Sequence, residues 1–173
     1  MPDLADNRPQ IDQLQFREAM SRIAAAVHVV TSDGPGGRAG FTASAVCSVS
    51  DTPPTVLVCV NHSSRQNPLL HANGVLCINT LCPQSRDLGD LFSGQLGIAH
   101  EDRFDHVDWS TGITGAQVLS GSAMSLEGRI SDIARVGSHD VFYVEVMAIH
   151  GKEDRDALLY FARSYRDLAK TAA

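Results

Sequence analysis

The fold of this chain is decided by the stretch GFTASAVCSVSDTPP, residues 40–54, in which apolar and hydroxyl-bearing residues alternate. Side chains at every second position share one face of a β-strand. On this spacing one face carries Phe41, Ala43, Ala45, Cys47 and Val49, and the other carries Thr42, Ser44, Ser48 and Ser50, with Val46 as the only break. Short hydroxyls beside small residues let a ligand approach the backbone, but they equally fit a strand with one solvated face.

The composition bounds the class of protein. The chain has 173 residues, 43% of them hydrophobic, and a formal net charge of -6. We therefore expect one soluble domain over residues 11–168 behind a flexible tail at 1–10. The acidic balance argues against a nucleic-acid partner, and the sequence lacks both an apolar run long enough to span a membrane and a signal peptide.

The four cysteines lack the paired spacing of a zinc site. Buried thiols in a reducing cytoplasm account for them better than a metal or disulfides. They are Cys47, Cys59, Cys77 and Cys82.

Strand patterns dominate the rest of the chain. Asp12 and Gln15 have capping-box spacing, and the helix they begin carries an apolar stripe that we expect to be buried: Phe16, Ala19, Met20 and Ile23. Short helices are expected at 67–73, with Asn67 as N-cap, and at 85–92, and a long loop at 93–117. Further strands are expected at 26–31, 55–60, 75–81, 122–132, 141–150 and 158–161. This order predicts a mainly β protein, a closed antiparallel barrel with short helices.

Two polar segments are ambiguous. Gly34-x-Gly36-x-x-Ala39 matches a dinucleotide fingerprint in spacing, but a strand pattern follows it where the fingerprint requires a helix, so we interpret it as a hairpin turn. His100-Glu101-Asp102-Arg103-Phe104-Asp105-His106 has no standard ligand spacing and is better explained as a solvated loop.

The segment Asn61-His62-Ser63-Ser64-Arg65-Gln66 stands directly before a predicted helix start. Two hydroxyls and a guanidinium at such a place suit a phosphate group, although an ordinary solvated loop is equally compatible with the pattern.

Four motifs in register resemble the flavin reductase-like family. They are Phe16-Arg17-x-Ala19-Met20, the stretch 40–54, Gly137-x-His139-Asp140 and Leu159-Tyr160-Phe161-x-Arg163-x-Tyr165. The resemblance covers the chain from Phe16 to Leu168 and implies a Greek-key, FMN-binding split β-barrel that forms homodimers. Residues 37–61 are most similar to FMN reductases of pyrimidine utilisation. They are second most similar to reductases that serve 4-hydroxyphenylacetate oxygenases.

The resemblance also implies roles for individual residues. The hydroxyl stretch, represented by Thr42, Ala43, Ser44, Ala45, Cys47, Ser48, Val49 and Ser50, would lie along the flavin ring and ribityl chain. Ser63, Ser64 and Arg65 would face its phosphate, with Arg65 in place of a family lysine. His139 would lie near the nicotinamide, although Ser138 replaces an aspartate of the family signature. Phe104, Tyr160, Arg163 and Tyr165 would wall the pocket.

The implied activity is NADH- or NADPH-dependent reduction of FMN, with FAD possible, for a partner flavin-dependent monooxygenase. Pyrimidine ring opening is the favoured downstream reaction, and 4-hydroxyphenylacetate hydroxylation is the other. A split-barrel FMN-dependent oxidase and a non-enzymatic flavin-binding protein remain as alternatives. From the residues alone, His139 could equally be a structural histidine in a turn that begins a strand. Tyr160 could equally be a residue of the hydrophobic core.

Overall fold

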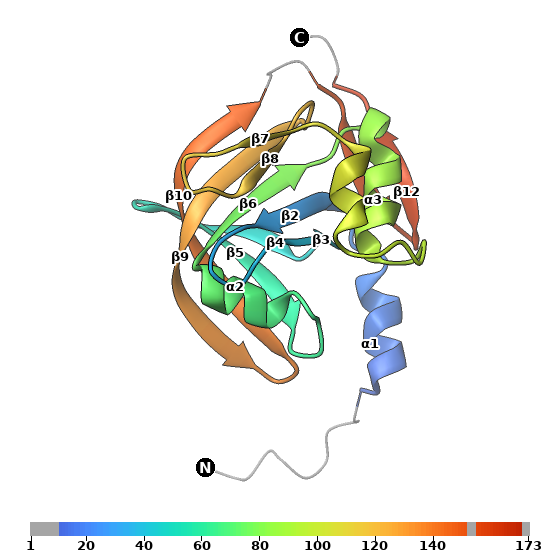
Figure 1. The fold of residues 1–173 in the computed structure, drawn as a ribbon. Helices are drawn as coiled ribbons and strands as arrows, with labels where there is room; N and C mark the ends of the chain where they lie inside the picture. The colour runs from blue at the N-terminus through green and yellow to red at the C-terminus, as the bar shows by residue number, and fades with distance from the viewer. Residues whose placement is uncertain (1–10, 152–154, 171–173) are drawn as a thin grey trace, which may run out of the picture.

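A computed structural model describes residues 11–151 and 155–170 of the chain. The tail predicted for residues 1–10 lies outside the described residues. Strands dominate the described part, with short helices around them (Figure 1). The prediction of a mainly β fold is confirmed.

The helices are short and lie on the outside of the sheets. The α-helices are α1 (Gln13–Met20), α2 (Asn67–Asn73) and α3 (Arg86–Ser93), and the 3₁₀ helices are η1 (Pro83–Ser85) and η2 (Asp102–His106). Asp12 caps α1 through the expected capping box, because its carboxylate accepts from the Gln15 N–H at 2.7 Å while the Gln15 side chain accepts from the Asp12 N–H.

Three antiparallel sheets contain the strands. The largest has the order β3-β2-β6-β9-β10-β5-β4, a second has the order β1-β11-β12, and a third pairs β7 with β8. In chain order the strands are β1 (Ala25–Ala26), β2 (His28–Ser32), β3 (Ala39–Ala43), β4 (Val46–Asp51), β5 (Pro54–Asn61), β6 (Val75–Thr80), β7 (Trp109–Thr111), β8 (Gln117–Leu119), β9 (Met124–Val136), β10 (His139–Gly151), β11 (Ala157–Phe161) and β12 (Ser164–Leu168).

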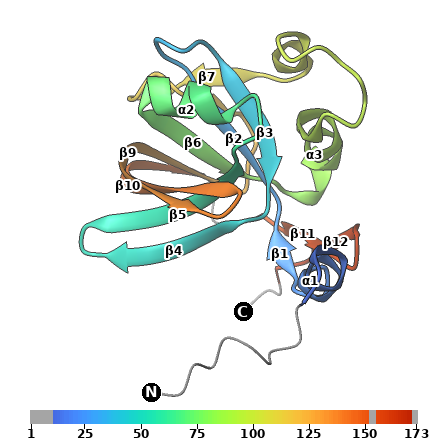
Figure 2. The same cartoon turned by 90° about the horizontal axis from the view of Figure 1, so that it is seen from below.

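The stretch that decides the fold forms two strands, β3 and β4, at opposite edges of the seven-stranded sheet. The sheet curls so that these edges meet where the chain passes from β3 to β4 through Ser44 and Ala45 (Figure 2). The Cys59 N–H of β5 donates to the Ala45 carbonyl at 3.1 Å and so extends the pairing of β4 with β5 to this point. The alternation changes phase at this break. Val46 therefore packs on the core, whereas Cys47 and Val49 are exposed, contrary to the prediction of one continuous period.

The apolar stripe of α1 is a second correction. Phe16, Met20 and Ile23 were expected to be buried, but α1 has no buried residue in this chain, and the Phe16 side chain is 57% exposed. The helix projects from the end of the molecule beside β11 and β12, where the sheet does not cover the stripe.

Smaller differences follow from packing. The loop at 93–117 contains η2 and β7, and β12 continues beyond the last predicted strand. The N-cap position of α2 is Gln66, because the amide of Asn67 donates to Asp140 at 3.1 Å instead of capping the helix. All four cysteines are free; Cys47 is exposed, Cys59 is half-buried, and Cys77 and Cys82 are buried.

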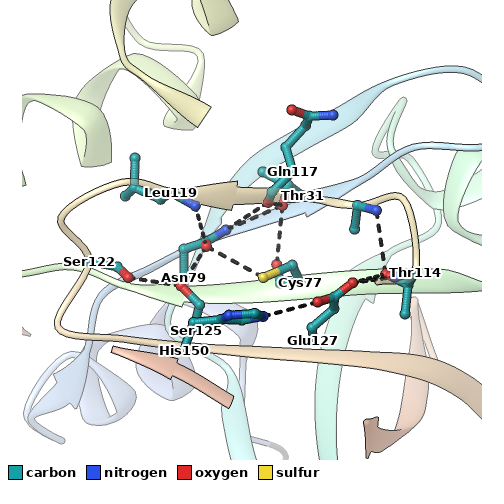
Figure 3. A network of polar contacts seen from close by, with 11 residues as sticks. Thr31, Cys77, Asn79, Thr114, Gln117, Leu119, Ser122, Ser125, Glu127 and His150 are labelled. Atoms are coloured by element: carbon teal, nitrogen blue, oxygen red, sulfur yellow. Dashed lines mark hydrogen bonds and ion pairs between the residues drawn. The ribbon is translucent and has the colours of Figure 1, made fainter. Parts of the chain in front are cut away.

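The interior has an apolar and a polar part. One apolar cluster, around Phe142 and Leu76, fills the barrel, and a second packs between the barrel, α3 and η2, around Phe92 and Phe104. A network of buried polar side chains lies at β6 and β9, around Asn79 and Glu127 (Figure 3). Asn79 Oδ1 accepts from the Leu119 N–H and the Ser125 hydroxyl, both at 2.8 Å.

Glu127 of β9 is wholly buried, which is rare for a carboxylate. Its carboxylate accepts from the Thr114 N–H and hydroxyl, and His150 Nε2 lies 3.1 Å away (Figure 3). Burial raises the pKa of Glu127, but these hydrogen bonds outweigh burial and hold the pKa below its usual value. Both oxygens of the buried carboxylate therefore have hydrogen-bonding partners.

None of the helices in the described ranges is both long and apolar enough to cross a membrane.

Candidate functional site

A groove lies where β3 ends and the barrel edges meet. It consists of two adjoining cavities that share Thr42, Ala43, Ser44 and Ser93. We call the first the barrel-edge cavity, of about 310 Å³, lined by Phe41–Ala45, Cys59–Asn61, Ser64, Phe92 and Ser93. We call the second the arginine cavity, of about 610 Å³, lined by Val27, Thr42–Ser44, Arg86, Asp90, Ser93, Gln95, Tyr160 and Arg163–Arg166.

Helix α3 packs closely against β3 and β12 beside the residues that the two cavities share. The Thr42 hydroxyl donates to the Gly89 carbonyl at 2.6 Å, and the Tyr165 hydroxyl donates to Asp90 at 3.0 Å. A Cβ at Gly89 would lie 2.6 Å from the Tyr165 hydroxyl oxygen, so glycine is needed at this approach. Burial, and then the neighbouring Asp90 carboxylate, raise the pKa of Tyr165, which therefore stays a neutral donor.

The barrel-edge cavity has an apolar floor and a polar rim. Phe41, Ala43, Val60 and Phe92 supply carbon surface, while the hydroxyls of Ser44, Ser64 and Ser93 and the amide of Asn61 stand at its edges. Such a mixture suits a planar ring system with a polar chain.

The arginine cavity is rich in cations and aromatic rings. Arg86 pairs with Asp167 at 2.5 Å and lies 5.9 Å from the centroid of the Tyr165 ring. Arg163 pairs with Glu18 of α1 at 2.9 Å. Tyr160 meets Tyr165 edge-on with 5.5 Å between ring centroids. Guanidinium groups beside aromatic faces suit a ligand with phosphates and a heteroaromatic base.

The turn that presents Arg163 is unusual. Ala162 and Arg163 connect β11 to β12 with φ values of 49° and 60°, a left-handed conformation that non-glycine residues adopt at a cost. The Ala162 N–H donates to the Ser21 carbonyl at 2.8 Å. This bond and the Arg163–Glu18 ion pair fix the turn against the end of α1.

His139 begins β10, opposite Asn61 of β5 in the antiparallel register. It does not line either cavity, but Asn61, its strand partner, lines the barrel-edge cavity. The Nδ1 of His139 lies 2.9 Å from the Ser138 hydroxyl.

The neighbouring residue, Asp140, ties this strand end to the loop 61–66 and to α2. Its carboxylate oxygens lie 2.8 Å from His62 Nε2 and 2.9 Å from His71 Nε2, and they accept from Asn67. These contacts, first that of His71, hold the pKa of Asp140 well below its usual value. The ionised carboxylate thus holds the ends of three elements together.

The structure places part of the predicted site in the groove. Eight predicted residues line it: Thr42, Ala43, Ser44, Ala45, Ser64, Tyr160, Arg163 and Tyr165. Ser63 and Arg65 flank Ser64 on an exposed loop outside both cavities. The side chains of Cys47, Ser48, Val49 and Ser50 are exposed along β4, beyond the groove.

Phe104 does not form a pocket wall. It is 3% exposed in the second core cluster, packed edge-on against Phe92 with 5.2 Å between centroids, and it lies behind Gly40. Burying its ring completes the apolar cluster, so it supports the wall from behind.

Sequence reasoning missed Arg86, Asp90, Ser93 and Arg166. A signal for three of them was present, because residues 86, 90 and 93 follow the i, i+4, i+7 spacing of one helical face. Arg166 had no comparable signal, since β12 was not predicted.

The fold and the groove define a class: a split-barrel protein with an open, phosphate-compatible site for flat aromatic ligands. The family described as "Flavin reductase like domain" matches residues 20–169. This chain belongs to that family, which confirms the resemblance found in its motifs.

Individual relatives agree. The protein named FMN reductase (NADH) RutF from Stutzerimonas stutzeri is 51% identical over 156 residues, which cover 90% of this chain and 88% of that protein. The structure of the NADH:FAD oxidoreductase SgcE6 of Streptomyces globisporus, with NAD and FAD fragments, has a TM-score of 0.85 and 29% identity, and the match covers 94% of this chain and 96% of that one. BorF, the flavin reductase component of a bacterial two-component tryptophan halogenase, has a TM-score of 0.85 and 27% identity, and the match covers 92% and 100%.

Proposed function

We propose that this protein is an NADH-dependent FMN reductase that supplies diffusible reduced FMN to a separate flavin-dependent monooxygenase. One observation carries the proposal: Thr42, Ala43 and Ser44 line both cavities, so a ligand in each cavity lies against the same three residues. The relatives named as NADH-dependent FMN reductases support the choice of cofactors.

The residues present fit a flavin. The apolar floor of Phe41, Ala43 and Val60 suits the isoalloxazine ring, and the rim hydroxyls and backbone groups of 42–45 suit its polar edge and ribityl chain. Ser64 continues the rim towards the exposed Ser63 and Arg65, which we assign to the phosphate. The exposed residues Cys47–Ser50 of β4 lie beyond the groove. We propose that they contact the flavin only if a second copy of the chain extends the groove to them.

Bound flavin would accept hydride at N5 from C4 of the reduced nicotinamide. The protein's part in this reaction is alignment. The shared residues hold both ligands at one place, which makes the encounter effectively unimolecular. The hydrogen bond from Thr42 to Gly89 fixes the shared residues, and that from Tyr165 to Asp90 fixes the neighbouring side of the arginine cavity. The family resemblance alone assigns His139 to nicotinamide placement, because His139 lines neither cavity; Asp140 fixes the strand end that carries it. The reaction requires no protein acid.

The openness of the groove supports release of the product. Ser44, Ser93, Tyr160 and Arg163 are exposed, so a noncovalently held flavin can leave after reduction. We assign the product to a pyrimidine-ring-opening oxygenase, since the curated relative of highest identity reported above carries the RutF name; a 4-hydroxyphenylacetate oxygenase is the other consumer. We place the reaction in the cytoplasm, where four free thiols persist.

The test follows NADH oxidation by the purified protein while FMN, FAD or riboflavin is added. Turnover that saturates with FMN supports the reductase; oxidation of a further substrate on tightly bound FMN would indicate the oxidase, and flavin binding without NADH oxidation would indicate a binding protein. Adding a pyrimidine oxygenase and uracil then tests the downstream assignment.

Two variants test the residue roles in the same assay. Arg65→Ala should weaken FMN by about 1.5–3 kcal/mol and leave riboflavin unchanged, because only FMN carries the phosphate. His139→Ala should slow flavin reduction while FMN affinity stays intact. Arg129→Ala is the charge-matched control, since Arg129 pairs with Glu145 on the outer face of β9 and lines neither cavity.

A further inference from the structure

We propose that a third cavity, lined by β8, the end of β10 and Arg155, is a separate binding site for a small carboxylic acid that also carries an O–H or N–H donor. We call it the β8–β10 cavity; its volume is about 290 Å³. None of its lining residues lines the barrel-edge cavity or the arginine cavity. The proposal therefore concerns a ligand other than the flavin and the nicotinamide, and it does not depend on the proposed function.

Arg155 gives this cavity a positive charge. The residue is half-buried, and among the described residues no carboxylate forms an ion pair with it. In that part of the chain its guanidinium donates only to the sulfur of Cys82, a weak acceptor, at 3.8 Å. Both terminal nitrogens lie beside Gly121, since a Cβ at that glycine would be 3.9 and 4.0 Å from them. A half-buried guanidinium with free donors favours a carboxylate, which it binds through two parallel hydrogen bonds.

The Ser122 hydroxyl is an acceptor in this cavity. Ser125 has one hydroxyl proton, which it donates to Asn79 Oδ1 at 2.8 Å, because an amide oxygen can only accept. In the 2.8 Å contact between the two serine hydroxyls, the donor is therefore Ser122 (Figure 3). Its proton is committed to the buried network, so Ser122 presents only oxygen lone pairs to a ligand. Such a group selects a ligand that donates a hydrogen bond.

His150 is held by the buried Glu127. An ionised carboxylate can only accept, so the His150 Nε2, 3.1 Å from Glu127, carries a proton (Figure 3). In the neutral ring the remaining lone pair is on Nδ1, a second acceptor. The negative charge of Glu127 behind this histidine disfavours a ligand with two negative charges. The cavity therefore suits a monoanion better than a phosphate dianion.

The size of the cavity limits the ligand further. Its volume is at the lower end of the range for small-molecule sites, which begins at about 300 Å³. Val118 and Leu119 of β8 supply carbon surface beside the polar groups. A ligand of a few carbon atoms, with a carboxylate for Arg155 and a donor for Ser122, matches all parts of the lining. Lactate has this composition and serves as the probe.

The experiment titrates lactate into the isotope-labelled full chain and follows the backbone amide resonances by NMR. Propionate, which lacks the hydroxyl, and lactamide, which lacks the charge, are the matched ligands. The amide signals of Gly121, Ser122 and Gly151 should shift and saturate with lactate at millimolar concentrations. Propionate should bind several-fold more weakly, and lactamide should produce no saturable shift.

Two variants assign the contacts. Arg155→Gln should weaken lactate binding about tenfold, because a charge-assisted pair is lost, and Arg155→Lys should recover part of the affinity. Ser122→Ala should bind lactate and propionate equally, since the acceptor that distinguishes them is gone. Arg129→Gln is the charge-matched control, because Arg129 pairs with Glu145 and lines none of the three cavities. It should bind lactate as the wild type does.

Shifts that do not saturate in the wild type, or that saturate at the same lactate concentration in Arg155→Gln, would overturn the site. Equal affinities of the wild type for lactate and propionate would overturn the role of Ser122. Thermal unfolding of each variant distinguishes a loss of binding from a loss of folding. Flavin and NADH are absent from these titrations, so a failure here leaves the proposed reductase function standing, and the reverse also holds.

Discussion

The barrel buries polar side chains whose protonation differs between the folded and the unfolded chain. His28 on β2 is an example: it is 7% exposed, and its Nδ1 lies 3.1 Å from the Thr80 hydroxyl. Desolvation by burial lowers the pKa of His28 to about 4, from 6.5. The folded chain therefore keeps this imidazole neutral at pH values where the unfolded chain protonates it.

His28 should make stability depend on pH. Below pH 6.5 His28 is protonated in the unfolded state, whereas in the folded state it stays neutral down to about pH 4. The free energy of unfolding therefore falls as the pH drops from 6.5 to about 4. The total loss is about 3 kcal/mol. Urea unfolding of His28→Asn, measured from pH 7 to pH 4, should show a flatter decline than the wild type.

The control for this prediction is His106→Asn, because His106 is exposed. Its stability should decline with pH as the wild type does. An equal slope for His28→Asn and the wild type would mean that His28 is protonated in the folded state.

Glu127 shows why sequence reasoning fails for such residues. Glutamate is rarely buried, yet a buried carboxylate is viable here because Thr114, from the turn between β7 and β8, supplies two donors. The partner lies 13 residues away, in a segment predicted to be a loop. No local pattern contains that contact.

At the scale of elements, the hydroxyl stretch was predicted correctly as β structure and wrongly as one strand. Val46 marked the break between the two strands, because it is an apolar residue at a position where the alternation calls for a hydroxyl-bearing one. A strand whose alternation shifts by one residue changes faces at that point. The shift turns Cys47 and Val49 away from the core, and Cys47–Ser50 are all exposed on β4. Half of the eight hydroxyl-stretch residues that were predicted to contact the flavin therefore lie beyond the groove.

The approach of α3 to β12 gives the second prediction. Gly89→Ala would drive a methyl group into the Tyr165 hydroxyl and break its hydrogen bond to Asp90. We expect a loss of about 1–2 kcal/mol in thermal or urea unfolding, after the helix propensity of alanine offsets part of the clash.

A double-mutant cycle separates the clash from other effects. In a Tyr165→Phe background, which lacks the hydroxyl, Gly89→Ala should cost much less. An equal cost in both backgrounds would locate the strain elsewhere on α3.

At the scale of the whole molecule, the exposed stripe of α1 predicts a second copy. Phe16, Met20 and Ile23 expose large apolar side chains, beside exposed Tyr160 and Phe161 of β11. We propose that this face forms the interface of the homodimer that the sequence led us to expect. Each α1 also contacts the Arg163 turn of its own groove through Glu18.

The prediction is a mass measurement. Light scattering or sedimentation at micromolar concentration should give a dimer for the wild type and a monomer for Phe16→Glu/Ile23→Glu, because burying two carboxylates in an apolar interface is prohibitive. Arg17→Gln, on the same helix, should remain dimeric. A monomeric wild type would contradict the proposal and leave the stripe unexplained.

The sequence predicted the fold class and order of elements well, since strand periodicity and turn residues are local signals. It located the groove through the hydroxyl stretch and the Tyr160–Tyr165 motif. It missed the α3 wall because Arg86, Asp90 and Ser93 acquire a role only when β12 packs beside them. Pairings between distant elements create the second cavity, and single-sequence patterns do not encode them directly.

The meeting of the two barrel edges at Ser44 and Ala45 has a consequence for evolution. The same two residues turn the chain from the first strand of the large sheet to its last and also line the ligand groove. Selection for folding and selection for binding therefore act on one dipeptide. In a deep mutational scan, substitutions at Ser44 and Ala45 should lower the abundance and the activity of the protein together. Substitutions on α1 or β4 should change one of the two scores without the other.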